Sequence, residues 1–263
     1  GSRYPIIDFP DVRRLLLLMK SGTEAMRALA YLASAEIDKA HFAADADRRA
    51  SHMARVELFT PIVKGWLTEL SQELTSHGVQ IHGGMGFIEE TGSAQHYRDA
   101  RITTIYEGTT AIQANDLVGR KTLANNGEVL AALLRDIQAT ADNMQAVDGL
   151  ADMGTSLAQV VAQGEAARQW LLDHAGEDRY AAGSASVNYL MLLGYLCGGW
   201  VMGQAALKAQ ALLDAGQGDK GFLETKRVTA RFYFEHLLPR ASACLAAVEA
   251  GSSSVMALAP EQF

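Results

Sequence analysis

The sequence predicts an all-α protein made of two successive helical bundles. Apolar residues recur at spacings of three, four and seven along most of the 263 residues, which is the spacing of one helix face. Alanine and leucine, both strong helix formers, dominate the composition. No two alternating segments are joined by a hairpin signal. The turn residues Asn125-Asn126-Gly127 interrupt the pattern, so we expect one helical domain over residues 1–124 and a helical extension over residues 125–263.

The first half carries two long predicted helices. Pro10 and Asp11 open the first, and a second is predicted over about residues 48–76, bent locally at Pro61. Their apolar faces are Leu15, Leu18, Met19, Met26, Leu29 and Leu32 in the first, and Phe59, Ile62, Val63, Trp66, Leu70 and Leu74 in the second.

The helical pattern then breaks at His77-Gly78. Glycines are frequent from there to Glu107, so we expect the least helical part of the chain in this stretch. Helical character resumes near Thr110 and continues to about residue 123.

The second half predicts four more helices, with glycine-bearing loops between them. They cover about residues 128–147, 154–174, 184–214 and 221–250. The stretch 189–203 is almost wholly apolar, but its 15 residues fall short of the roughly 20 that span a bilayer. We therefore predict a buried central helix and no membrane span.

Composition excludes several classes of function. The net charge is −7, whereas a nucleic-acid-binding protein needs a basic face. The seven histidines form no metal-ligand pair at helical spacing beside a carboxylate, so no metal site is predicted. Cys197 and Cys244 lie in apolar, helix-like surroundings without a CxxC pair, which favours buried thiols in a reducing compartment, and we expect a cytoplasmic protein.

One motif that can carry chemistry is the glycine-rich segment from Gln80 to Phe87. Its adjacent glycines, Gly83 and Gly84, follow a predicted helix and leave backbone amides exposed, which suits a pyrophosphate or the edge of a flavin. A plain helix-terminating turn has the same composition. Spacing alone leaves both interpretations open.

The second motif is the segment from Arg98 to Thr110, which contains Glu107. This glutamate follows an apolar and β-branched run, and the threonines after it can cap the next helix. A carboxylate held against apolar surroundings acquires a raised pKa and can act as a base near neutral pH. The alternative is an acid in the first turn of a helix, stabilised there by the helix dipole.

Taken together, these two motifs resemble the acyl-CoA dehydrogenase family in order and spacing. The resemblance lies in Gln-x-x-Gly-Gly-x-Gly-Phe at 80–87, Arg-Asp-Ala-Arg-Ile at 98–102 and Ile-Tyr-Glu-Gly-Thr at 105–109. The segment at residues 5–14, the extension after residue 125 and the ending Ala-Leu-Ala-Pro-Glu-Gln-Phe resemble a longer bacterial subgroup. That subgroup includes dehydrogenases of methylthio-substituted and medium-chain acyl-CoAs.

The resemblance implies roles for individual residues. Glu107 would be the general base that removes the α-proton of an acyl-CoA thioester, and Gly108 would lie near the substrate. FAD would accept a hydride from the β-carbon, which yields a trans-2-enoyl-CoA. The remaining implied FAD contacts are Gln80, Ile81, His82, Gly83 and Gly84, toward FAD bound mainly by a neighbouring subunit, and Thr109, Thr110 and Ala111 near the diphosphate.

Two positions in these motifs differ from the usual family residues, and one pair is given a structural role. Many family members carry glutamine where this chain has Ala111, so a side-chain contact is not expected there. His82 replaces a residue that is more often apolar, and it is given no chemical role. Arg98 and Asp99 are interpreted as a structural pair.

The resemblance also implies what lies beyond this chain. Family members have an N-terminal helical domain and a β-domain before the C-terminal bundle, and here the bundle is truncated at its start. We therefore expect the fragment alone to bind FAD poorly and to be inactive. An electron-transfer flavoprotein as acceptor and a homo-dimer or tetramer are expected, whereas an acyl-CoA oxidase fragment and a non-enzymatic helical oligomerisation module are the alternatives.

Overall fold

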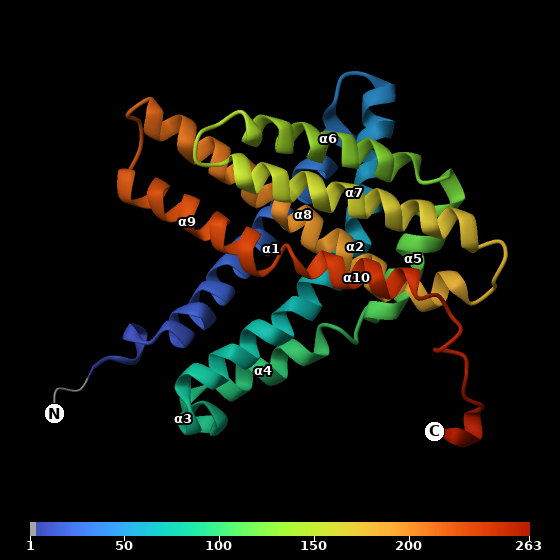
Figure 1. Ribbon diagram of the computed structural model, residues 1–263, viewed down its shortest axis with the longest axis horizontal. Helices are drawn as coiled ribbons and strands as arrows, with labels where there is room; N and C mark the ends of the chain where they lie inside the picture. Colours follow the sequence, from blue (N-terminus) through green and yellow to red (C-terminus); the bar gives the residue numbers. More distant parts are fainter. Residues whose placement is uncertain (1–3) are drawn as a thin grey trace.

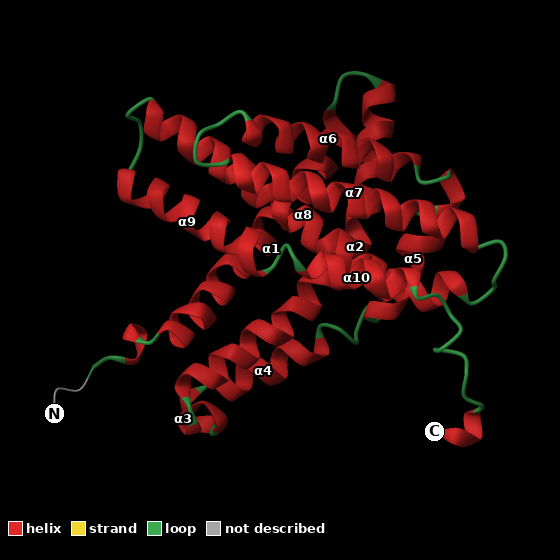
Figure 2. Ribbon diagram, viewed as in Figure 1, coloured by secondary structure: helices red, strands yellow, loops and turns green. Residues whose placement is uncertain are grey.

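The computed structural model describes residues 4–263 and confirms the all-α fold. Helices joined by loops make up this whole range, and no strand occurs in it (Figure 2). The α-helices are α1 Pro10–Phe42, α2 Ala46–His82, α3 Gly84–Phe87, α4 Ser93–Ile102, α5 Thr110–Gly119, α6 Glu128–Gln145, α7 Ala151–His174, α8 Ala181–Asp214, α9 Lys220–His236 and α10 Arg240–Glu249. Four short 3-10 helices, η1 Ile6–Asp8, η2 Glu89–Thr91, η3 Leu123–Asn125 and η4 Pro260–Gln262, accompany them.

The predicted turn at Asn125-Asn126-Gly127 is confirmed. Asn126 and Gly127 both adopt left-handed backbone angles, with φ of 53° and 69°. One continuous hydrophobic cluster nevertheless contains residues from both sides of this turn, among them Trp66, Leu117, Leu133 and Leu190. The division of the chain into two domains near residue 125 stays a prediction.

The helix α8 forms the centre of the molecule. It crosses behind α7 and α10 and lies against α1, α2 and α5 (Figure 1). By length and composition α8 could cross a membrane, but 78% of its most apolar window is buried among the other helices. The predicted buried central helix is therefore confirmed.

Glycines in α8 let the neighbouring helices approach closely. An added Cβ at Gly194 would lie 2.1 Å from Cγ of Trp66, and one at Gly198 would lie 2.1 Å from the Tyr233 hydroxyl. The Tyr233 hydroxyl donates a hydrogen bond to the Tyr195 carbonyl at 3.0 Å. Large aromatic side chains of α2 and α9 thus fill the space that α8 leaves free.

The predicted end of the second helix is wrong. The second helix continues past residue 76 to His82, so Gly78 lies inside α2 and its low helix propensity alone does not end the helix. The stretch before Glu107 is consequently more helical than predicted, since it includes α4.

The last predicted helix is two helices. Pro239 interrupts the range 221–250 because it has no N–H to donate, so α9 ends at His236 and α10 begins at Arg240. At Pro61, in contrast, α2 continues without a break. The local bend expected there stays a prediction.

Both cysteines are free. Cys197 is buried in α8, as predicted, and burial raises the pKa of its thiol to about 12. Cys244 in α10 is only half-buried, which differs from the prediction.

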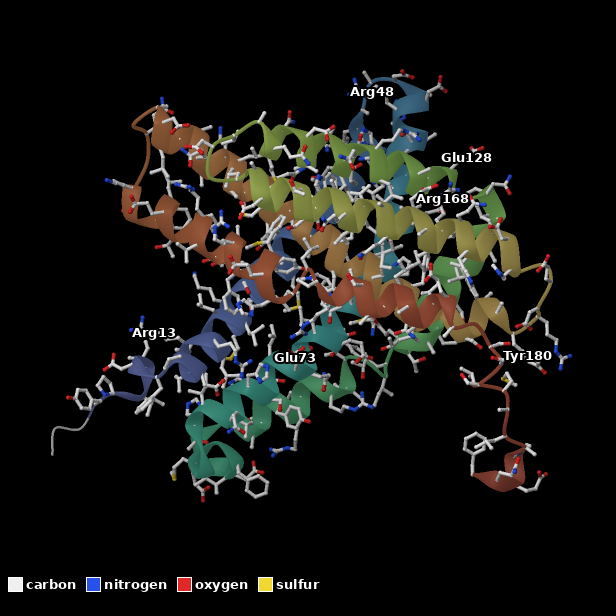
Figure 3. All side chains as sticks on the ribbon, viewed as in Figure 1. Arg13, Arg48, Glu73, Glu128, Arg168 and Tyr180 are labelled. Atoms are coloured by element: carbon white, nitrogen blue, oxygen red, sulfur yellow. The ribbon has the colours of Figure 1, made fainter. Side chains whose placement is uncertain are left out.

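An ion pair joins the extension to α2. Arg240 of α10 donates to both carboxylate oxygens of Glu73 at 2.6 and 2.8 Å. The Arg240 guanidinium lowers the pKa of the Glu73 carboxyl, and partial burial opposes this shift. Figure 3 labels Glu73 where α2 leaves the main body of helices and continues into an arm, residues 73–102, that ends in α4.

Candidate active site

The glycine-rich turn lies at the tip of the arm, between α2 and α3 (Figure 1). Gln80, Ile81 and His82 are the last residues of α2, and Gly83 ends that helix with φ 60° and ψ −144°. Only glycine adopts this backbone conformation readily, which accounts for Gly83. The turn therefore does terminate helix α2, as one of the two interpretations of this motif expects.

The same turn also offers space to a ligand. Nothing lies within 4 Å of a Cβ added at Gly83 or Gly84, whereas one at Gly86 would lie 2.3 Å from the Val79 carbonyl oxygen. Gly86 is thus required by packing within the chain. The openness at Gly83 and Gly84 is compatible with the close approach of a flat or charged group from outside.

His82 takes part in the end of α2. Its Nδ1 lies 2.8 Å from the Gly78 carbonyl oxygen, the only acceptor in that contact, so this nitrogen carries the proton. The side chain is otherwise exposed.

Glu107 lies in the loop between α4 and α5, with an unusual backbone. Its φ is 51°, in the left-handed region, and that of Gly108 is 96°. The helix α5 begins only at Thr110, after its N-cap Thr109, so the interpretation of Glu107 as a first-turn acid is wrong. The Thr109 hydroxyl accepts the Ile112 N–H at 3.3 Å, which confirms the predicted cap.

The carboxylate of Glu107 is exposed, and no side chain of residues 4–263 hydrogen-bonds to it. The apolar enclosure expected around it is not provided by the described residues. Large apolar side chains lie uncovered near it in sequence: Ile105, Tyr106 and Ile112 are each about half exposed, at 48, 49 and 59%. This surface is suited to an apolar cover, and residues 4–263 do not supply one.

The arm carries two cavities, and neither is lined by Glu107. One of about 620 Å³ is lined by α2, α4 and the turn between them, with Val79, Phe87, Ile88 and Tyr97 in its wall. A second cavity, of about 440 Å³, is lined by Thr23, Gly78, His82 and His96. The sequence-predicted turn residue His82 therefore lines a hollow, whereas the predicted base does not.

Arg98 has a different partner from the one expected. Its guanidinium donates to both oxygens of Glu89, at 2.7 and 2.8 Å, and Asp99 instead accepts from Gln95 at 3.4 Å. Within helix α4, Arg98 points toward Glu89 of η2 and Asp99 points elsewhere, so the two residues do not pair with each other. The pair of Arg98 and Glu89 is exposed and joins two parts of the tip of the arm, η2 and α4.

The described residues contain no group of three or more histidine, cysteine or acidic side chains that could hold a metal ion. The chemistry available to this surface therefore rests on the glycine turn, the α5 N-terminus and the exposed carboxylate.

Two family profiles match this chain. The profile described as acyl-CoA dehydrogenase, C-terminal domain, matches residues 2–122, and that described as acetyl-CoA dehydrogenase C-terminal like matches residues 133–259. The chain belongs to the acyl-CoA dehydrogenase family. Within that family it corresponds to the C-terminal helical portion.

Individual relatives agree with this assignment. The chain is 46% identical to 3-methylmercaptopropionyl-CoA dehydrogenase of Ruegeria pomeroyi, over 91% of this chain and 40% of the relative. It is 35% identical to a broad-specificity linear acyl-CoA dehydrogenase of Mycobacterium tuberculosis, over 100% of this chain and 44% of the relative. The chain thus spans about two-fifths of the length of these acyl-CoA dehydrogenases.

A solved structure shows the same fold. Acyl-CoA dehydrogenase from Bacillus anthracis, complexed with FAD, superposes with a TM-score of 0.72 at 20% identity, over 94% of this chain and 43% of that one. The helical arrangement of both halves of this chain is therefore that of an acyl-CoA dehydrogenase of known structure.

Proposed function

We propose that the complete protein is an FAD-dependent acyl-CoA dehydrogenase that oxidises an acyl-CoA thioester to a trans-2-enoyl-CoA. The observation that carries the proposal is the placement of Glu107, whose carboxylate is presented to the outside from a left-handed loop next to Gly108. The relatives named as dehydrogenases of 3-methylmercaptopropionyl-CoA and of linear acyl-CoAs support an acyl-CoA substrate.

Glu107 is the general base in this proposal. The α-proton of a thioester is only weakly acidic, so the base must be well placed and little hydrated when it acts. Glu107 accepts the proton at a carboxylate oxygen, and the backbone of Gly108 lies near the thioester, although the Gln113 amide nitrogen lies 2.7 Å from where a Cβ of Gly108 would stand. FAD, when bound, supplies the acceptor for the hydride that leaves the β-carbon.

The chain's own residues fit such a cofactor. Gln80 to Gly84 present an open turn, and the N-terminus of α5, at Thr110 and Ala111, can stabilise a negatively charged diphosphate through the helix dipole. The Thr109 hydroxyl already caps α5, and the Thr110 hydroxyl donates to Glu69. Backbone amides rather than these two hydroxyls are therefore proposed to contact FAD, and Ala111 offers only a methyl group.

The 263-residue chain by itself is proposed to be inactive. A base that must be little hydrated is exposed to water here, and Phe87 at the tip of the arm is 81% exposed. We propose that the other parts of the protein, or a second subunit in a homo-dimer or tetramer, cover this surface. An electron-transfer flavoprotein as acceptor and a cytoplasmic location complete the proposal.

The test is a visible absorbance spectrum of the complete protein under anaerobic conditions, before and after addition of a panel of acyl-CoAs. The panel contains 3-methylmercaptopropionyl-CoA and linear chains of several lengths. The expected result is bleaching of the flavin band by one class of acyl-CoA, absent in a Glu107→Gln variant that retains FAD.

Glu249→Gln is the matched control, because Glu249 is exposed at the end of α10 and far along the chain from the motifs. It should bleach at the wild-type rate. Bleaching at that rate in Glu107→Gln as well would refute the base, and a protein that takes up no FAD would favour a helical oligomerisation module. Stoichiometric hydrogen peroxide in air would identify an oxidase instead.

A further inference from the structure

We propose that Lys64 and Glu69 of α2 are positioning residues that hold the loop of Glu107 in its reactive geometry. The inference rests on the proposed function of Glu107 as the base. Both side chains are half-buried on the part of α2 that faces the segment 100–110.

Lys64 holds the loop on the side before Glu107. Its ammonium group donates to the carbonyl oxygen of Thr103 and lies 5.2 Å from the centre of the Tyr106 ring. A cation over an aromatic face is attractive, and Tyr106 directly precedes Glu107. One side chain therefore fixes both the end of α4 and the residue next to the base.

Glu69 holds the loop on the side after Glu107. Its carboxylate accepts the Thr110 hydroxyl at 2.5 Å, and Thr110 is the first residue of α5. One turn of α2 further on, Gln72 donates to the Ala100 carbonyl at 2.5 Å. The segment 100–110 is thus attached to α2 at three points: at Ala100, at Thr103 before Glu107, and at Thr110 after Glu107.

The loop before Glu107 is bonded within itself, because the N–H groups of Ile105 and Tyr106 donate to the Ile102 carbonyl at 3.0 and 3.1 Å, whereas the bonds that reach across the loop are weaker. The Thr110 N–H reaches the Thr104 carbonyl at 3.3 Å, and the Gln113 amide reaches the Glu107 carbonyl at 3.4 Å. Both distances are long for such hydrogen bonds. A non-glycine residue in the left-handed region persists only where its surroundings enforce that conformation, and the α2 contacts act on both sides of Glu107.

Loss of either attachment should move the carboxylate without unfolding α2. Phe59, Ile62, Trp66 and Leu70 of α2 are buried in a hydrophobic cluster that contains no residue of the segment 100–110. Misplacement of a catalytic group by about 1 Å can slow a reaction on the order of 100-fold. The effect should therefore be large on the chemical step and small on folding.

The test compares paired variants in the complete protein. Lys64→Met removes the donor and the charge, whereas Lys64→Arg keeps both. Glu69→Leu removes the acceptor for Thr110, whereas Glu69→Gln keeps one. The measurement is the anaerobic rate constant of flavin reduction by saturating acyl-CoA, expressed per bound FAD, together with the acyl-CoA dissociation constant.

We expect Lys64→Met and Glu69→Leu to lower that rate constant by about 10- to 100-fold, with acyl-CoA affinity close to wild type. Lys64→Arg and Glu69→Gln should restore most of the rate. A merely structural role predicts instead a loss of FAD content or of folded protein with an unchanged rate per bound FAD, and that result would overturn the inference.

Glu107→Gln in the same series separates the two hypotheses. If Glu107→Gln reacts at the wild-type rate, the proposed function fails. If Glu107→Gln is slow while Lys64→Met and Glu69→Leu are fast, only the positioning role fails.

A second measurement covers variants that bind no FAD. In the 263-residue chain, amide hydrogen exchange of residues 103–109 should be faster in Glu69→Leu than in Glu69→Gln, while exchange in α8 is the same in both. Equal exchange of residues 103–109 in the two variants would overturn the inference without any activity measurement.

Discussion

Replacing Gly194 with alanine should destabilise the chain although alanine is the better helix former. The added Cβ would lie 2.1 Å from Cγ and 2.4 Å from Cδ1 of Trp66, whereas non-bonded carbons prefer roughly 3.5–4.0 Å. The Trp66 side chain is fully buried, and its far ring edge faces Gly198, which lies in α8 like Gly194. The helices α2 and α8 would therefore have to move apart.

The magnitude follows from two opposing terms. Overpacking of a core typically costs about 1–3 kcal/mol, and overlaps this short favour the upper end. The exchange of glycine for alanine within a helix returns about 1 kcal/mol. The net loss should be about 2 kcal/mol, which for a chain of this length lowers Tm by about 4–8 °C.

The assay is thermal and urea unfolding of the 263-residue chain, followed by far-ultraviolet circular dichroism. Gly183→Ala is the matched control, because Gly183 is exposed in the same helix and nothing lies within 4 Å of an added Cβ. That variant should be as stable as wild type or up to about 1 kcal/mol more stable. A Gly194→Ala chain that melts above wild type would refute the close contact between Trp66 and α8.

Three further predictions concern other parts of the molecule. Arg240→Met should cost about 1–2 kcal/mol at pH 7 in urea unfolding, because Glu73 loses its charged partner. Since Arg240 lowers the folded-state pKa of Glu73, this stabilisation is present above the unfolded pKa of about 4.3 and disappears as pH falls through the folded pKa, so the variant and wild type should converge in acid. Tyr189→Phe should cost about 1 kcal/mol, because the buried hydroxyl lies 3.1 Å from that of Thr122; an unchanged urea midpoint would contradict that bond. Burial and a pKa of about 12 should keep Cys197 unlabelled by a thiol reagent at pH 8 until the chain unfolds, which mass spectrometry of the labelled peptide can check.

The sequence predicted most of the fold because the helix faces repeat locally. The boundaries of α6, α7 and α8 lie within about three residues of those expected. The errors arise where one residue is weak or strong evidence for a helix end: Gly78 lies inside α2 without ending it, whereas Pro239 separates α9 from α10 within a continuous apolar pattern.

The site was predicted only in part, for a similar reason. Two linked motifs located Glu107 and the glycine turn, and the order of residues was enough for that. The loop that carries Glu107 is attached to α2 by the bond between Glu69 and Thr110, which lie 41 positions apart. No local pattern indicates which polar side chains of α2 face outward and which face this loop, so Lys64 and Glu69 were missed. The roles of Gln80, Thr109 and the other site residues stay predictions.

The position of α8 also has a consequence for how the protein is made. Trp66 is covered by Gly194 and Gly198, which are synthesised 128 and 132 residues later. At roughly 5–20 residues per second, a ribosome needs about 6–26 s to add those residues. During that interval the first half of this chain carries its largest core side chain without the surface that buries it.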